Sequence, residues 1–182
     1  MVATFKRMRK GGVSVTFGAD ESTVLRHVLT EMIELLGADD SAEDDPLAVA
    51  VGIGTSTKVP EDPALARLFP DGYTDDPDAS ADFRRYTESG LRTAKREALQ
   101  TALSTVGEPD ERVSLTPEQA EAWLRALNDT RLVLGERLGI TEELEEVIES
   151  LGDDDPRLAL FWVYDRLTYL QESLVQALWA GP

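Results

Sequence analysis

The sequence predicts a mainly α-helical fold, a helical bundle with an N-terminal β-hairpin, with an α+β fold as the minor alternative. Five segments begin with Asp-Pro or Thr-Pro, and both pairs are typical helix starts. Long segments after these starts carry apolar residues at helical spacing, whereas clear alternation appears only near the N-terminus. With 182 residues and 42% hydrophobic residues, the chain is long enough to form one core, and we expect residues 1–182 to be a single domain.

The net charge, the apolar runs and the cysteine content of the chain argue against several classes of function. The net charge of −17 repels nucleic-acid phosphates and anionic membrane surfaces at long range. No apolar run approaches the roughly 20 residues that cross a bilayer, and no apolar segment follows the basic N-terminus as in a signal peptide. The chain has no cysteine for a disulfide, a thiolate metal site or a nucleophile. We therefore expect a cytoplasmic protein without membrane partner or cofactor.

Residues 1–18 predict a β-hairpin arm. Lys10-Gly11-Gly12 supplies a turn, and Val13, Val15 and Phe17 alternate with polar residues. A lone hairpin is marginal in water, so it must pack on helices or on another copy. The arm is basic, with Lys6, Arg7, Arg9 and Lys10. These charges could pair with the acidic body of the same chain or of a neighbouring chain, or they could bind nucleic acid. Pairing with an acidic protein body is favoured, because four charges contact only a few phosphates.

Four main helices are expected at 20–37, 77–104, 116–139 and 156–179, with an acidic linker containing short helices at 38–76 and a short acidic helix after Thr141. The helix at 20–37 has a broad apolar face and carries the only histidine, His27. A metal site on bundle helices needs histidines and carboxylates from several helices. We therefore interpret His27 as structural and expect no metal site.

The helix at 77–104 is unusually basic for this chain. Its candidate inward positions are Phe83, Tyr86, Leu91, Ala94, Ala98 and Leu99, and Ser89-Gly90 is a candidate kink. The simplest interpretation of its arginines is pairing with neighbouring carboxylates on the surface. The functional alternative is a face that binds anions or acidic peptides, formed by Arg84, Arg85 and Arg92.

The helix at 116–139 is expected to be central. Thr116 and Gln119 form a capping box around Pro117, and Gly139 is a left-handed stop. Its apolar stripe contains Trp123, Leu124, Leu127, Leu134 and Leu138, and polar Asn128 and Arg131 fall within or beside it.

The final helix has two adjacent stripes. Leucines form one, and Trp162, Asp165, Tyr169 and Glu172 form the other. If this helix packs on the central one, Arg131 is expected to meet Asp165 or Glu172, because a partly buried guanidinium favours a carboxylate. One interpretation is a buried ion pair that fixes register. The other is a pocket or partner surface lined by Trp123, Asn128, Arg131, Asp165, Tyr169 and Glu172.

Several strings taken together resemble an actinobacterial family classed as a domain of unknown function, DUF2017. They are FKRMRKGGV, PEDPALARLFPDGY, ADFRRYTESGLR, AWLRALNDTRLVLGERLGI and VYDRLTYLQESLVQAL. The resemblance covers nearly the whole chain. It implies genes that lie beside the gene of ClpS, the adaptor that delivers substrates to the Clp protease, and some members are labelled transcriptional regulators. It supplies no catalytic residues.

The sequence thus favours a non-enzymatic interaction or regulatory protein, linked through the resemblance to Clp-type proteolysis. No nucleophile or oxyanion hole is recognisable, so no catalytic residue is assigned. The first alternative is a transcriptional regulator that binds nucleic acid through the hairpin; the acidic body argues against it. The second is a small-molecule or anion pocket around Arg131. The expected partner is an unidentified protein, and a homodimer is one option.

Overall fold

The computed structural model describes residues 2–9, 11–37, 58–140, 152, 155 and 157–179. The helices are α1 Ala19–Gly37, α3 Pro63–Leu68, α4 Pro77–Ser104, α5 Pro117–Leu138 and α7 Arg157–Trp179, and the strands are β1 Lys6–Arg7, β2 Val13–Thr16 and β3 Arg112–Leu115. The mainly α-helical class is confirmed. Residues 38–57 of the predicted linker and the short acidic helix after Thr141 lie outside the described residues, apart from Gly152. The single domain stays a prediction.

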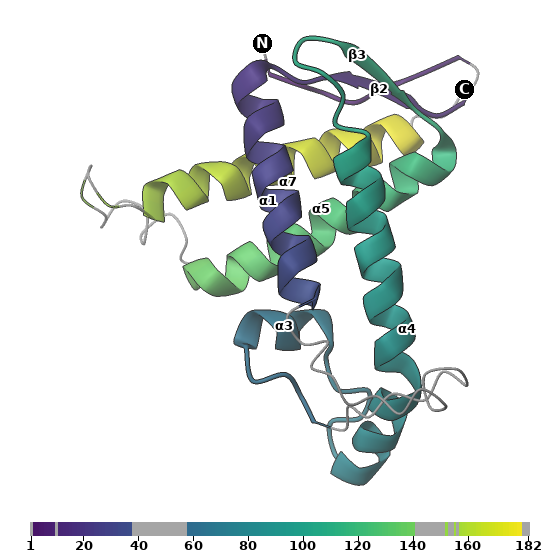
Figure 1. Cartoon of the computed structure of the whole chain (residues 1–182), viewed down its shortest axis with the longest axis vertical. Coiled ribbons are helices and arrows are strands. Elements are labelled where there is room, and N and C mark those ends of the chain that lie inside the picture. Colours follow the sequence, from purple (N-terminus) through teal and green to yellow (C-terminus); the bar gives the residue numbers. More distant parts are fainter. Residues whose placement is uncertain are drawn as a thin grey trace.

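Helix α5 is the centre of the molecule. It contacts α1, α3, α4, α7 and β3, and it lies side by side with α7, while α1 and α4 run across both (Figure 1). Its ends form as predicted: Thr116 Oγ1 accepts from the Gln119 N–H at 3.2 Å, and Gln119 Oε1 accepts from the Thr116 N–H at 2.9 Å. Gly139 closes the helix with φ 63°.

The two N-terminal strands and β3 form one antiparallel sheet in the order β1-β2-β3. The predicted hairpin is confirmed, and the sequence analysis did not anticipate the third strand, which lies just before α5. Val13 pairs with Leu115 and Val15 with Val113. Such a short strand is stabilised by pairing with a distant segment, which local patterns do not reveal. The turn needs glycine: at Gly12 φ is +74°, and a Cβ atom would lie 2.2 Å from the Leu115 carbonyl oxygen.

An aromatic cluster joins the sheet to α5. The Trp123 ring stacks on Phe17 with centroids 5.5 Å apart, and Phe5 approaches Trp123 edge-on at 5.7 Å. Trp123 is fully buried, and its Nε1–H donates to Thr105 Oγ1 at 2.8 Å. The hairpin thus packs on the helices of its own chain.

Helix α4 reverses part of the predicted pattern. Its N-terminal half projects beyond the crossed helices, where α3 and the following turn lie beside it (Figure 1). Phe83, Tyr86, Leu91 and Ala94 were expected inside but are exposed. Arg84, Glu88 and Arg92 are buried instead. Apolar spacing alone missed this, because the three charged side chains satisfy one another. The helix also runs unbroken past Ser89-Gly90, while Ala98 and Leu99 are buried as predicted.

Candidate partner-binding surface

Helix α7 has a buried face and an exposed face. Leu167, Leu170 and Leu174 are buried. The second predicted stripe lies outside: Trp162 is 73% and Tyr169 42% exposed, and both of the stripe's carboxylates are exposed too. Because residues three or four apart share one helical face, this stripe is continuous along α7. An exposed tryptophan within a continuous stripe of this kind marks a candidate contact surface.

Beside Trp162 lies a groove of about 290 Å³ between the first turns of α1 and the N-terminal half of α7. We call it the α1–α7 groove; it is lined by Asp20, Glu21, Val24, Leu25, Trp162, Val163, Arg166 and Leu167. Leu25 and Leu167 are buried, while Val24 is 40% exposed. The walls of the groove are therefore apolar. Its charged side chains are Asp20 and Glu21 from the first turn of α1 and Arg166 from α7.

Arg166 holds the elements of the groove together. Its guanidinium pairs with Glu21 of α1 and donates to the Ala3 carbonyl at 2.7 Å. It also lies 5.0 Å from the centre of the Tyr169 ring, and the Tyr169 hydroxyl is 3.0 Å from Thr4 Oγ1. These contacts tie α1, the N-terminal segment and α7 together, so the groove is preformed.

Arg131 makes contacts other than the predicted ones. It donates to Thr168 Oγ1 and Gln171 Oε1, both at 2.9 Å, and lies over the Tyr164 ring at 5.3 Å. The predicted ion pair with Asp165 or Glu172 is therefore wrong. Residues 164, 168 and 171 share the face of α7 that meets α5, and the two carboxylates lie on the exposed side.

The six side chains of the predicted pocket do not converge. Trp123 belongs to the core, and Arg131 lies in the α5–α7 seam, so the exposed face of α7 keeps only Asp165, Tyr169 and Glu172. Asn128 lines a different cleft, of about 540 Å³, between α4, α5 and α7. That cleft also contains Lys95 and Asp129, whose Nζ and Oδ1 atoms are 2.9 Å apart.

The three arginines of the predicted anion-binding face of α4 do not form one exposed surface, because Arg84 and Arg92 are buried. Arg84 donates to Glu88 at 2.6 Å, to Asp71 at 2.9 Å and to the Phe69 carbonyl at 3.0 Å. Arg92 donates to Glu88 and to the Leu36 carbonyl, both at 2.9 Å.

Burial alone would lower the pKa of Arg84, but its hydrogen bonds with Glu88 and Asp71 outweigh this and raise that pKa. These donors are engaged inside the protein. Only Arg85 is partly exposed, with its guanidinium 3.6 Å from Asp82.

The hairpin presents its basic side chains outward. Lys6, Arg7 and Arg9 are exposed, and Lys10 lies outside the described residues. The inner side of the arm packs on α7, where the Phe5 N–H donates to Ser173 Oγ at 3.2 Å. The arm is therefore fixed to its own chain by its apolar and backbone groups, and a role for its charges stays a prediction.

His27 is exposed on α1, and the described part of the chain contains no group of three or more His, Cys, Asp or Glu side chains placed to hold a metal ion. None of the described helices combines the length and apolar character needed to cross a lipid bilayer.

The profile of the family described as "Domain of unknown function (DUF2017)" matches residues 2–178. The chain belongs to the DUF2017 family. This confirms the resemblance seen in the sequence strings.

Curated relatives of this DUF2017 chain come from mycobacteria. The "Putative oxidative stress regulator AosR" of Mycobacterium leprae is 38% identical over 175 residues, which cover 88% of this chain and 79% of the relative. The "Oxidative stress regulator AosR" of Mycobacterium tuberculosis H37Rv is 39% identical over 173 residues, covering 87% and 78%. No solved structure matches.

Sequence reasoning placed Trp162 and Tyr169 of this DUF2017 chain in a candidate surface but missed Val24, Glu21 and Arg166. The first two lie on α1, more than a hundred residues away in the sequence, and Val24 belongs to the broad apolar face that the sequence predicted for that helix. A usable signal was the width of that face, which exceeds what one packed helix side needs. Its outer edge, at Val24, forms a wall of the groove.

Proposed function

We propose that this DUF2017 protein is a non-enzymatic cytoplasmic regulator that acts by binding a protein partner through the α1–α7 groove and the exposed face of α7. The observation that carries the proposal is the Trp162 side chain, 73% exposed beside a preformed apolar groove. Tryptophan and tyrosine dominate the binding energy of protein interfaces, and apolar patches rimmed by polar groups mark such interfaces.

The regulatory part of the proposal draws on the relatives, which are named oxidative stress regulators. These 182 residues contain no cysteine, so thiol oxidation within them is not available as an input. We propose that the signal reaches this protein through its partner. A connection to Clp-type proteolysis, implied by the family's gene neighbourhood, is the finer form of the same proposal.

The test uses two tryptophans of one helix. Trp162→Ala removes the groove residue, and Trp179→Ala removes a side chain that is 77% exposed near the end of α7 and does not line the groove. In the organism of origin, deletion of the gene is expected to change transcript and protein levels after peroxide treatment. Wild type and Trp179→Ala are expected to restore them, and Trp162→Ala is expected to fail.

Two results would contradict the proposal. A deletion strain with an unchanged peroxide response would remove the regulatory role. Full restoration by Trp162→Ala would remove the groove from it. Protein half-lives measured in the same strains test the proteolytic form, which requires that specific proteins persist longer or shorter without this chain.

A further inference from the structure

We propose that the occupant of the α1–α7 groove is a basic amphipathic helix of a partner protein. This inference rests on the proposed function, because it names the chemistry of the partner that the same surface binds. Its apolar side chains enter the groove, and its Lys or Arg side chains meet the carboxylates around it and the face of Trp162.

The shape of the groove favours a side-chain anchor. Its volume of about 290 Å³ lies at the lower edge of the range of small-molecule pockets, roughly 300–1,000 Å³. The floor is made by Leu25 and Leu167, which are buried, and Val24 and Trp162 form exposed walls. A trough between two helices that is apolar along its floor is the usual receptor for one face of an amphipathic helix.

The charges around the groove are mostly negative. Asp20 and Glu21 line it, and Asp165 lies one turn from Trp162 on α7. Arg166 is the one cation in the lining, and it is already bound to Glu21 and to the Ala3 carbonyl. Asp20 and Asp165 are exposed and make no ion pair within the described part of the chain, so they are available to a partner's cations.

Trp162 adds a second site for a cation. An indole face binds Lys or Arg more strongly than the other aromatic rings do, and this indole is 73% exposed. The apolar floor suits the leucine-like face of a helix, and the carboxylates and the indole suit basic residues on either side of that face. An acidic or neutral helix would satisfy only the floor.

The charge of the whole chain argues against the other occupants. A second copy would bring another body of net charge −17 against an acidic rim. Nucleic acid and anionic lipid meet the same repulsion. A basic protein segment is the class of partner for which both long-range attraction and local contacts are favourable.

The probe is a synthetic amphipathic helix of about five turns, built from Leu and Lys, with a Leu/Glu peptide of the same pattern as its counterpart. Binding to the full-length chain is measured by calorimetry at two salt concentrations. The Leu/Lys peptide is expected to bind and the Leu/Glu peptide is not. Trp162→Ala is expected to weaken binding at least about tenfold, and Trp179→Ala to leave it unchanged.

Charge-matched variants separate the groove from the general acidity of the protein. Asp20→Asn with Asp165→Asn is expected to weaken binding about fivefold at low salt. Asp78→Asn with Glu97→Gln removes the same charge from exposed positions of α4 and is expected to stay within about twofold. The indole N–H signal of Trp162, assigned with the Trp162→Ala variant, is expected to move on titration.

Equal losses in the two charge-matched pairs would overturn the inference, because binding would then follow net charge alone. Equal binding of the Leu/Glu peptide would overturn the charge argument, and a dimer in sedimentation that Trp162→Ala abolishes would make a second copy the occupant. These results leave the cellular test untouched: if Trp162→Ala still fails to complement, the surface stands and only the partner's class is wrong. If the peptide binds in the groove while the Trp162→Ala variant complements the deletion fully, the inferred class of partner stands and the cellular role proposed for the groove is wrong.

Discussion

The buried cluster on α4 and the seam between α5 and α7 use arginine in opposite ways. On α4, Arg84 and Arg92 flank Glu88, and all three side chains are at most a tenth exposed. In the seam, Arg131 meets a hydroxyl, an amide oxygen and an aromatic ring. The sequence correctly predicted that the α4 arginines pair with carboxylates, but it placed these pairs on the surface. It also predicted a carboxylate partner for Arg131, which the structure does not show.

The difference comes from the spacing of acids on each helix. Glu88 lies four residues from both Arg84 and Arg92, so one carboxylate serves two guanidinium groups on a single helical face. Asp71 supplies a second carboxylate to Arg84, so Glu88 and Asp71 together balance the two guanidinium groups. Charges paired in this way can be buried beneath neighbouring backbone, where the arginines also bond the carbonyls of Phe69 and Leu36. Arg131 has no such partner facing it, and a half-buried cation can be satisfied by neutral acceptors.

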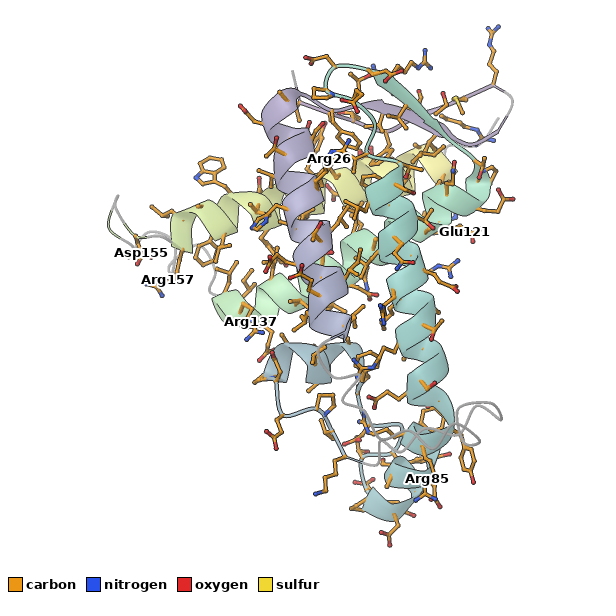
Figure 2. All side chains as sticks on the ribbon, in the orientation of Figure 1. Arg26, Arg85, Glu121, Arg137, Asp155 and Arg157 are labelled. Atoms are coloured by element: carbon orange, nitrogen blue, oxygen red, sulfur yellow. The ribbon has the colours of Figure 1, made fainter. Side chains whose placement is uncertain are left out.

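The comparison is tested most severely at Glu88. Glu88→Ala leaves two buried guanidinium groups without their shared carboxylate, so we expect a loss of about 3–5 kcal/mol in the free energy of unfolding. Urea denaturation followed by circular dichroism measures it. The control is Glu121→Ala, because Glu121 and its partner Arg125 are both exposed. Figure 2 labels Glu121 near the N-terminal end of α5. The control substitution should change stability by less than about 0.5 kcal/mol.

A triple variant shows whether charge itself is required in the cluster. Arg84→Met, Glu88→Leu and Arg92→Met together remove every buried charge of the triad, and we expect recovery of about 1–3 kcal/mol relative to Glu88→Ala. Recovery is partial because the carbonyls of Phe69 and Leu36 lose their donors. A triple variant less stable than Glu88→Ala would contradict this account.

A smaller effect is expected in the seam. Arg131→Met removes hydrogen bonds to Thr168 and Gln171 but strands no carboxylate, so we expect a loss of about 1–2 kcal/mol. Arg125→Met, on the exposed side of the same helix, is the control and should be nearly neutral. A loss as large as that of Glu88→Ala would show that Arg131 does neutralise an acid after all.

The smallest effect belongs to a surface ion pair at the start of α7, between Arg157 and the partly buried Asp155. Asp155 and Arg157 are labelled in Figure 2, and the hydrogen bond from Arg157 lowers the pKa of Asp155 from 3.8 to about 2. Because the folded pKa is depressed, the stabilisation is present above pH 3.8 and is lost as the pH falls through about 2. A carboxyl NMR titration should find the lowered midpoint, and Arg157→Gln should return it toward 3.8. An unchanged midpoint in the variant would mean that backbone contacts alone set it.

The sequence by itself determined the helices and where they begin and end. Asp76-Pro77, Thr116-Pro117 with Gln119, and Gly139 fix termini through contacts within a few residues, so their chemistry can be read locally. The exposed stripe of α7 was also visible, because helical spacing groups Trp162, Asp165, Tyr169 and Glu172 whatever their surroundings. The resemblance to the DUF2017 family was visible as well, because it rests on long strings of consecutive residues and needs no tertiary structure.

Tertiary structure decided which side of each pattern faces inward. Whether Trp123 lines a pocket or fills the core depends on Phe5 and Phe17, which arrive from the other end of the chain. The third strand exists because β2 pairs with it, and the groove exists because α1 crosses α7 beside Trp162. The spacing of apolar residues in the sequence tells only which side chains share a face of one helix or strand. Burial depends on the second element that covers them, and the free energy of that contact is absent from any local stretch of sequence.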